Sequence, residues 1–171
     1  MSFIFSLEVW EMLSYIVTVV GLPFALYVFL QEEKKERLNE QEEIYQKLAD
    51  EYAEFSKILI DNADLQLLSG HSTADGMLTP EQREKRLIIF DLLTSLCERA
   101  YILIYEETMD KQTARLWQTW EDYINVWIER PDYRQALPGL LQGEDPDFGE
   151  FMKKKLAAFG GVSAGHPQST P

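Results

Sequence analysis

The stretch Leu13–Leu30, LSYIVTVVGLPFALYVFL, decides the organisation of this chain. It contains no charged residue, and its neighbours Met12 and Gln31 are uncharged as well. Because an α-helix rises about 1.5 Å per residue, about 20 such residues make a rod of about 30 Å, the thickness of the hydrocarbon core of a bilayer. We therefore expect a transmembrane helix over residues 12–31, preceded by a short extracytoplasmic N-terminus, residues 1–11.

A cleaved signal peptide is the competing interpretation of this stretch, and the flanking residues argue against it. A signal peptide begins with a basic region, whereas Glu8 and Glu11 stand there and no A-x-A-like cleavage site follows. A buried helix of a soluble protein rarely lacks every charge over about 20 residues. Trp10, Tyr15 and Tyr27 lie near the two ends of the stretch, where the headgroup region favours amphipathic rings. These features favour a membrane span.

The charged residues predict the orientation of the span. All 16 Lys and Arg residues follow it, and Lys34, Lys35 and Arg37 lie directly beside it. Basic residues next to a span stay in the cytoplasm, whereas acidic neighbours have little influence. We expect a cell-membrane protein with its N-terminus outside and its C-terminal body in the cytoplasm. The net charge of -13 argues against a nucleic-acid partner, which requires basic surface.

Small residues gather on one face of the expected span. Ser14, Thr18, Gly21 and Ala25 follow one another at the spacing of a helical face. Small side chains allow two transmembrane backbones to approach closely, so this face predicts contact with another transmembrane helix, from a second copy or from a partner. An oligomer is therefore an open alternative. Pro23 predicts a kink between it and Gly21, because proline removes a backbone donor and clashes one turn back.

A long helix is expected directly after the span. Residues 31–68 contain no Gly or Pro and are rich in Glu, Gln, Lys and Leu. The segment up to Glu43 is almost wholly polar and predicts a solvated stalk. Beyond the stalk, apolar residues recur at alternating spacings of three and four, at Tyr45, Leu48, Tyr52, Phe55 and Leu59. Because a coiled coil normally needs three or four heptads and only about two are present, packing against the chain's own domain is favoured.

Capping and breaking residues predict the remaining helices. We expect one from Thr79 and Pro80 to about Glu107, one from Asp110 to Ile128, a short one at Asp132–Leu137 broken by Pro138–Gly139, and one from Asp145 and Pro146 to Gly160–Gly161. The predicted fold is all-α, with a single transmembrane helix, a helical stalk and a small cytoplasmic bundle of about four helices. Stalk and bundle occupy residues 32–159, and residues 160–171 have the composition of a flexible tail.

Three tryptophans mark one face of the helix expected from Asp110 to Ile128. Trp117, Trp120 and Trp127 lie at spacings of three and seven. Packing in the core is the favoured interpretation. The alternative is a partner surface, because tryptophan is frequent at binding hot spots.

The motifs of the common catalytic sites are missing from the sequence. There is no G-x-S-x-G elbow, Walker loop, G-x-G-x-x-G or H-E-x-x-H, and the E-x-x-H pairs of di-iron bundles are missing too. The single cysteine, Cys97, lies on an apolar helix face and excludes a disulfide framework. His71 and His166 lie in segments with loop composition. We therefore expect no catalytic residue, no cofactor-binding residue and no metal ligand, and thus a protein that is not an enzyme.

Several segments carry a resemblance to a known group of proteins. They are GLPFALY at 21–27, EEIYQKLADEYAEF at 42–55, WQTWEDYINVWIERPDYRQAL at 117–137 and DPDFGEFM at 145–152. The chain resembles a family of uncharacterised bacterial membrane-anchored proteins with one N-terminal span and a cytoplasmic helical body. The resemblance extends over most of residues 10–155 and implies topology, fold and a location in the bacterial inner membrane, but it transfers no functional residues.

A weaker likeness, of layout alone, is to small membrane-spanning helical accessory effectors of bacterial defence systems, some of which assemble as pores. The Arg-x(4–6)-His signature of their helical nuclease relatives is missing here. The leading expectation is a membrane-anchored, non-catalytic interaction or scaffold protein, whose partners are the lipid bilayer and another transmembrane helix. An oligomeric pore-forming effector is the alternative, and a ligand-sensing membrane protein is the third.

Overall fold

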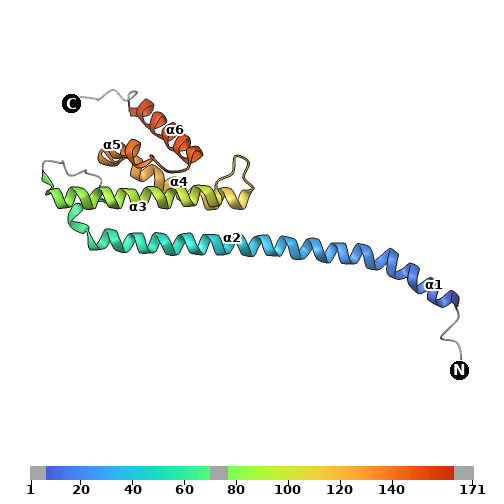
Figure 1. Ribbon diagram of the computed structural model, residues 1–171. Coiled ribbons are helices and arrows are strands. Elements are labelled where there is room, and N and C mark those ends of the chain that lie inside the picture. Colours follow the sequence, from blue (N-terminus) through green and yellow to red (C-terminus); the bar gives the residue numbers. More distant parts are fainter. Residues whose placement is uncertain (1–6, 70–76, 164–171) are drawn as a thin grey trace, which may run out of the picture. The chain divides into compact units, whose positions relative to one another are not determined.

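The computed structural model describes residues 7–69 and 77–163, and every element in these two ranges is a helix (Figure 1). The predicted all-α class is therefore confirmed. The chain divides into two compact units, Met1–Gln46 and Lys47–Pro171.

The N-terminal unit is built from one continuous helical run. It comprises α1 (Leu7–Ile16), the π-helical turn η1 (Val17–Gly21) and the first part of α2 (Leu22–Asp61). The helix changes direction along this N-terminal part (Figure 1). The π-turn ends two residues before Pro23. In a regular α-helix the proline ring clashes with the carbonyl four residues earlier, and a wider turn relieves that clash. The helix is therefore irregular where the sequence predicts a kink.

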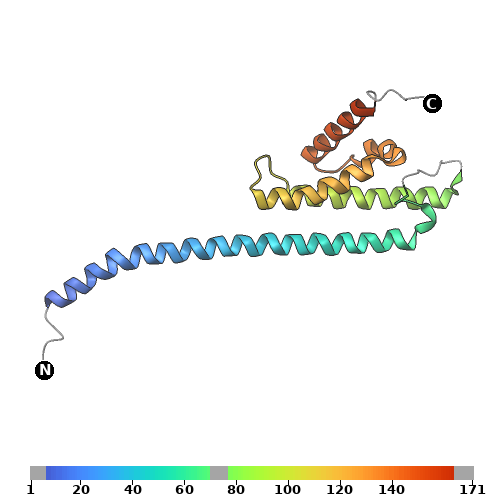
Figure 2. The same ribbon diagram turned by 180° about the vertical axis from the view of Figure 1, so that it is seen from behind.

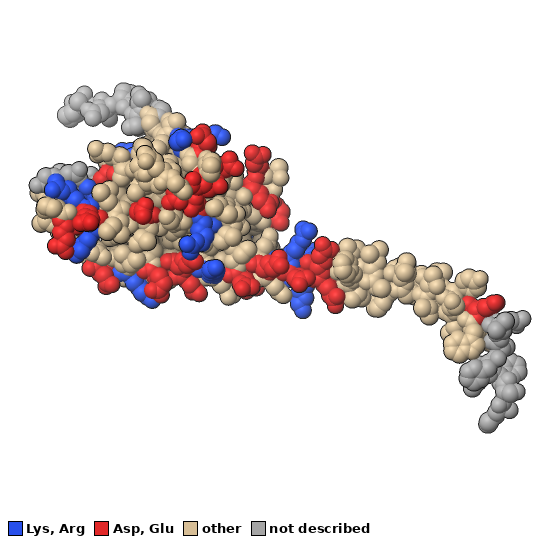
Figure 3. Space-filling view, viewed as in Figure 1, with Lys and Arg blue, Asp and Glu red and all other residues tan. Residues whose placement is uncertain are grey.

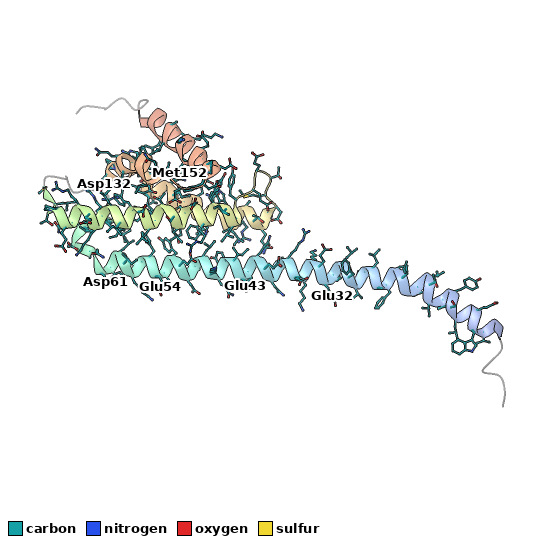
Figure 4. All side chains as sticks on the ribbon, in the orientation of Figure 1. Glu32, Glu43, Glu54, Asp61, Asp132 and Met152 are labelled. Atoms are coloured by element: carbon teal, nitrogen blue, oxygen red, sulfur yellow. The ribbon has the colours of Figure 1, made fainter. Side chains whose placement is uncertain are left out.

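This run has the length and composition of a membrane span. Residues Val9–Asp61 form one helix, near the N-terminus, whose apolar window has a mean hydropathy of 2.1 and is 0% buried. In Figure 3 the uncharged stretch is bounded by charged residues at both ends. Large apolar side chains along it are exposed, Tyr15 and Leu22 by 72% each. The stalk residues Glu32 and Glu43 follow on the same helix and are exposed (Figure 4).

Helix α2 ends at Asp61, although the absence of Gly and Pro predicted a helix up to residue 68. The Asn62 side chain donates from Nδ2 to the Ile58 carbonyl at 2.9 Å, and a short 3-10 turn, η2 (Ala63–Leu65), follows. Gln66 then adopts a left-handed conformation with φ 51°. Asparagine competes with the helix for its own backbone, so a helix ends here without Gly or Pro.

The C-terminal part of α2 packs against the bundle, as the spacing of its apolar residues predicted. Leu48, Phe55 and Leu59 are buried. Tyr52 stacks on Tyr123 of α4 (Lys111–Ile128), with ring centroids 4.4 Å apart. The apolar face of this helix is thus occupied within one chain.

Local capping sets the starts of the helices in the bundle, as predicted. Thr79 and Gln82 form a capping box at the start of α3 (Pro80–Ile104), with reciprocal hydrogen bonds of 3.0 and 3.1 Å. The Asp110 carboxylate accepts two backbone N–H bonds, at 2.8 and 2.9 Å, at the start of α4. Asp145 does the same at the start of α6 (Pro146–Ser163), with two bonds of 3.0 Å.

Two predicted breaks within helices are wrong. Helix α5 (Pro131–Leu140) continues through Pro138–Gly139, and α6 continues past Gly160–Gly161 to Ser163. Proline removes one hydrogen bond, and each glycine costs about 1 kcal/mol relative to alanine, so neither forbids a helix. Beyond Pro138 the turn is completed by the Leu141 N–H, which donates to the Leu137 carbonyl at 3.0 Å.

Helix α3 is the centre of the bundle and contacts α4, α5 and α6. In Figure 2, α5 and α6 lie on one side of α3 and the C-terminal part of α2 lies on the other. The largest fully buried side chains include Phe90 of α3, Tyr133 of α5, and Phe148 and Met152 of α6. The bundle thus has an aromatic core of its own.

Candidate functional site

The small-residue face of the span is divided by the π-turn. A π-turn holds one residue more than an α-turn, so residues on its two sides are offset by about 100° from regular helical spacing. Ser14 and Thr18 therefore share one face, and Gly21 and Ala25 share another. The Thr18 hydroxyl donates to the Ser14 carbonyl at 2.9 Å, so it is used within its own helix. The π-turn Val17–Gly21 interrupts the regular spacing of these four residues, and their contact with another transmembrane helix stays a prediction.

The three tryptophans of α4 are part of the core. Trp117 and Trp120 are each 4% exposed and Trp127 is 3% exposed. Trp127 lies against Phe90 and Tyr133, at 6.1 Å between ring centroids in both pairs. A ring with so little exposed surface offers a partner nothing to contact unless the bundle rearranges. The structure thus favours core packing over the alternative of a partner surface.

A groove lies between the C-terminal end of α3 and the first turns of α6. Its volume is about 590 Å³. We call it the Tyr101 groove. Its lining combines three aromatic rings with four carboxylates and a single basic residue: Tyr101, Ile102, Tyr105, Glu107, Asp145, Asp147, Glu150, Phe151 and Lys154.

The aromatic part of the Tyr101 groove is closely packed. Tyr101 and Tyr105 stack with centroids 4.6 Å apart and an interplanar angle of 15°. Phe151 lies 5.2 Å from the first ring and 5.4 Å from the second. The buried Trp117 supports them from behind, 5.1 Å from Tyr105 and 5.7 Å from Phe151. Each ring is thus held by others, and the aromatic surface is fixed in place.

The carboxylates give this groove a negative potential. Burial and the neighbouring Tyr105 raise the pKa of Tyr101, and the charges of Asp147, Asp145 and Glu107 raise it further. The three carboxylates that add to this shift also attract cations. The arrangement therefore suits a positively charged group on an aromatic surface.

Two further carboxyl groups, those of Glu98 and Glu144, lie close to the Tyr101 groove. Glu98 of α3 accepts a hydrogen bond from the Asp145 backbone N–H, and Glu144 accepts one from the Ser95 hydroxyl at 2.9 Å. Burial and a hydrogen bond with Glu98 raise the pKa of Glu144. These contacts join the loop before α6 to α3 and fix the position of the acidic rim.

The described residues offer little for catalysis. Within the parts of the chain that the structure describes, no group of three or more His, Cys, Asp or Glu is arranged to hold a metal ion. Cys97 is buried, and burial raises the pKa of its thiol to about 12, so it is not a nucleophile at neutral pH. His71 and His166 lie outside the described residues. That the chain is not an enzyme stays a prediction.

The Tyr101 groove was missed in the sequence because its two halves are about 40 residues apart. The one local signal is the spacing of Tyr101 and Tyr105, which places two rings on one helix face directly before Glu106 and Glu107. Comparisons with protein-family models, with curated proteins and with solved structures found no match to this chain.

Proposed function

We propose that this chain is a single-pass, membrane-anchored interaction protein without catalytic activity. Its N-terminal helix holds it in a bilayer, and its helical bundle binds a partner protein on the cytoplasmic side. The observation that carries the proposal is the apolar helix near the N-terminus, whose hydropathic window is 0% buried. Such a surface is costly in water and is stable in a lipid environment.

Position and orientation follow from the residues at the ends of this helix. Trp10 and Tyr27 are 57% and 59% exposed and lie near its two ends, where a bilayer has its headgroups. Lys34, Lys35 and Arg37 lie on the bundle side of the helix, which favours a bundle in the cytoplasm. The membrane is then the cell membrane, which in a bacterium is the inner membrane. The unit 47–171 has 13 basic and 21 acidic residues, and this excess of negative charge keeps the bundle away from anionic lipid.

The residues of the span favour a scaffold over a pore, because their small face is interrupted and they carry no charge. A pore needs one continuous polar or small face along each span, and the π-turn offsets Ser14 and Thr18 from Gly21 and Ala25. No residue between Met12 and Gln31 carries a charge that would hold water or ions.

Cysteine labelling of whole cells tests the topology. The only native cysteine, Cys97, is 1% exposed, so the native chain gives a low background. A membrane-impermeant maleimide should label Ser2→Cys in intact cells. It should label Gln135→Cys, at an exposed position of α5, only after permeabilisation. The reverse pattern would overturn the orientation, and release of the chain by alkaline carbonate would overturn the anchor.

The mass of the chain and its partners complete the test. The intact mass should include the apolar helix, because a cleaved signal peptide would remove it. Purification in mild detergent should recover a second protein in constant ratio, and purified chain should not conduct ions across planar bilayers. Single-channel currents would instead favour the pore-forming alternative.

A further inference from the structure

We propose that the Tyr101 groove binds a lysine or arginine side chain presented by a basic segment of a partner protein. The inference rests on the proposed function and names the chemistry of the partner. The groove joins the two features that recognise such a group, a surface of aromatic rings and a rim of carboxylates. Cations are attracted to the faces of aromatic rings, and a surrounding negative charge adds to that attraction.

The rings of α6 already take part in contacts of this kind within the chain. Lys155 Nζ lies 5.6 Å from the centroid of Phe151, and the Arg134 guanidinium lies 4.6 Å from that of Phe159. Lys155 is also paired with Glu121, so it is held on the α4 side of Phe151. The groove offers a third site of the same chemistry, and there the nearby charges are mostly negative.

The rim of the groove carries more acidic charge than its own basic residues neutralise. Glu150 is paired with Lys153 at 2.9 Å, which lowers the pKa of the Glu150 carboxyl. Lys154 is the one basic residue among those that line the groove. Glu107, Asp145 and Asp147 therefore supply the excess negative charge.

A partner's basic segment fits this surface better than a second copy of the chain does. The unit 47–171 contains 13 basic and 21 acidic residues, and like-charged units repel one another. The same field speeds the approach of a cationic partner. A segment with several charges also contacts carboxylates from both sides of the groove at once, because Glu107 follows α3 and Asp147 lies in the first turn of α6.

The probe for this proposal is a fluorescein-labelled peptide, Gly-Lys-Gly-Arg-Gly-Lys-Gly, with the full-length protein in lipid nanodiscs of uncharged lipid. Fluorescence anisotropy gives its Kd. The combined variant Glu107→Gln/Asp147→Asn should weaken binding about tenfold. Phe151→Leu should weaken it about threefold, because it removes one ring and keeps an apolar side chain. Lys154→Gln should tighten binding about threefold, an effect that a damaged fold does not produce.

The matched control is Asp50→Asn/Glu84→Gln, which removes two exposed carboxylates of the same unit outside the groove. It should leave the Kd within twofold. If Glu107→Gln/Asp147→Asn and the control variant weaken binding equally, general charge attraction explains the binding and the proposal is overturned. If spermidine competes as well as the unlabelled peptide, the occupant is a small polyamine and the proposal is overturned. If the chain forms a dimer that Glu107→Gln/Asp147→Asn dissociates, the occupant is a second copy of the chain, which also overturns it.

This result is separable from the proposed function. If the Glu107→Gln/Asp147→Asn variant stays in the membrane and still recovers the partner, only the proposal for the groove is refuted. A chain that leaves the membrane on carbonate extraction refutes the anchor, and the peptide titration still reports on the groove.

Discussion

Arg130 and Asp132 form a bidentate, hydrogen-bonded ion pair in the interior of the bundle, where α4 meets α5. Asp132 is labelled in Figure 4. Nε of Arg130 donates to Oδ1 at 3.1 Å and Nη2 donates to Oδ2 at 2.9 Å. Both side chains are less than one-tenth exposed, 7% and 9%. The same guanidinium donates from Nη1 to the carbonyls of Leu67 and Ser69, at 2.7 and 2.9 Å. Arg130 thereby holds the chain that follows η2.

Asp132→Asn should destabilise the bundle by about 3 kcal/mol, because it leaves two buried guanidinium groups, those of Arg130 and Arg86, without their carboxylate. Urea unfolding of the full chain in non-ionic detergent, followed by tryptophan fluorescence, measures the loss. The control is Glu51→Gln, which removes the partner of Arg99 in a 2.6 Å pair whose arginine is 53% exposed. It should cost less than about 1 kcal/mol. Equal losses would show that burial does not set the strength of the Arg130 pair.

The contrast between Arg130 and the helix caps shows which parts of this fold the sequence predicts. Thr79, Asp110 and Asp145 satisfy the first free N–H groups of helices that begin one residue later, so a short window of sequence contains the whole interaction. The partners of Arg130 at residues 67 and 69 are 63 and 61 positions away. No local pattern connects them, and only the tertiary structure brings them together.

The ends of helices and the candidate site were harder to predict for a related reason. Asn62 ends α2 through its own side chain, a role that asparagine plays only where the backbone allows it. Pro138 stays within α5, because tertiary packing outweighs the loss of one hydrogen bond. The Tyr101 groove forms where the ends of two helices meet, and the periodicity within either helix does not predict that they meet.

Trp120→Ala should cost about 3 to 5 kcal/mol, since it opens a cavity in a well-packed core. The ring is 4% exposed and lies edge-on to Tyr52, at 6.1 Å between centroids. Urea unfolding with circular dichroism checks the loss. Val126→Ala, at a 59% exposed position of the same helix, is the control and should stay within about 0.5 kcal/mol. A Trp120→Ala protein of normal stability that loses its co-purifying partner would restore the partner-surface interpretation.

Stability should fall in alkaline solution because of Cys97. Burial raises the pKa of its thiol from 9.0 to about 12. Between these values the unfolded chain releases the proton and the folded chain keeps it, so the folded state is disfavoured as pH rises. The free energy of unfolding should fall by about 1.4 kcal/mol per pH unit in this window.

The comparison of wild type with Cys97→Ala isolates the thiol from other groups that titrate at high pH. The difference between their free energies of unfolding should be constant below pH 8 and should shrink between pH 9 and 10. Burial first and Cys97 second raise the pKa of Tyr133, and burial alone keeps this phenol protonated in both folded proteins between pH 9 and 10. A difference that does not change with pH would mean that the thiol ionises equally in both states.

Helix association in the membrane should depend on one half of the divided small-residue face. A Cβ at Gly21 would lie 3.7 Å from the Val17 side chain, an ordinary contact, so its own helix accommodates a Cβ there. Loss of association in Gly21→Leu would therefore report on a neighbouring helix. We expect Gly21→Leu and Ala25→Leu to weaken association at least about tenfold, measured by energy transfer between labelled chains in vesicles. Thr18→Val should have little effect, because its hydroxyl bonds to Ser14 of the same helix. Val20→Leu, at a 61% exposed neighbouring position, is the size control.

Pro23→Ala tests whether the π-turn divides the face. It permits a regular α-turn at Val17–Gly21 and brings the two halves back onto one face, so Ser14→Leu should weaken association in the Pro23→Ala background alone. If Ser14→Leu is equally damaging with Pro23 in place, all four small residues share one interface and the π-turn does not divide it.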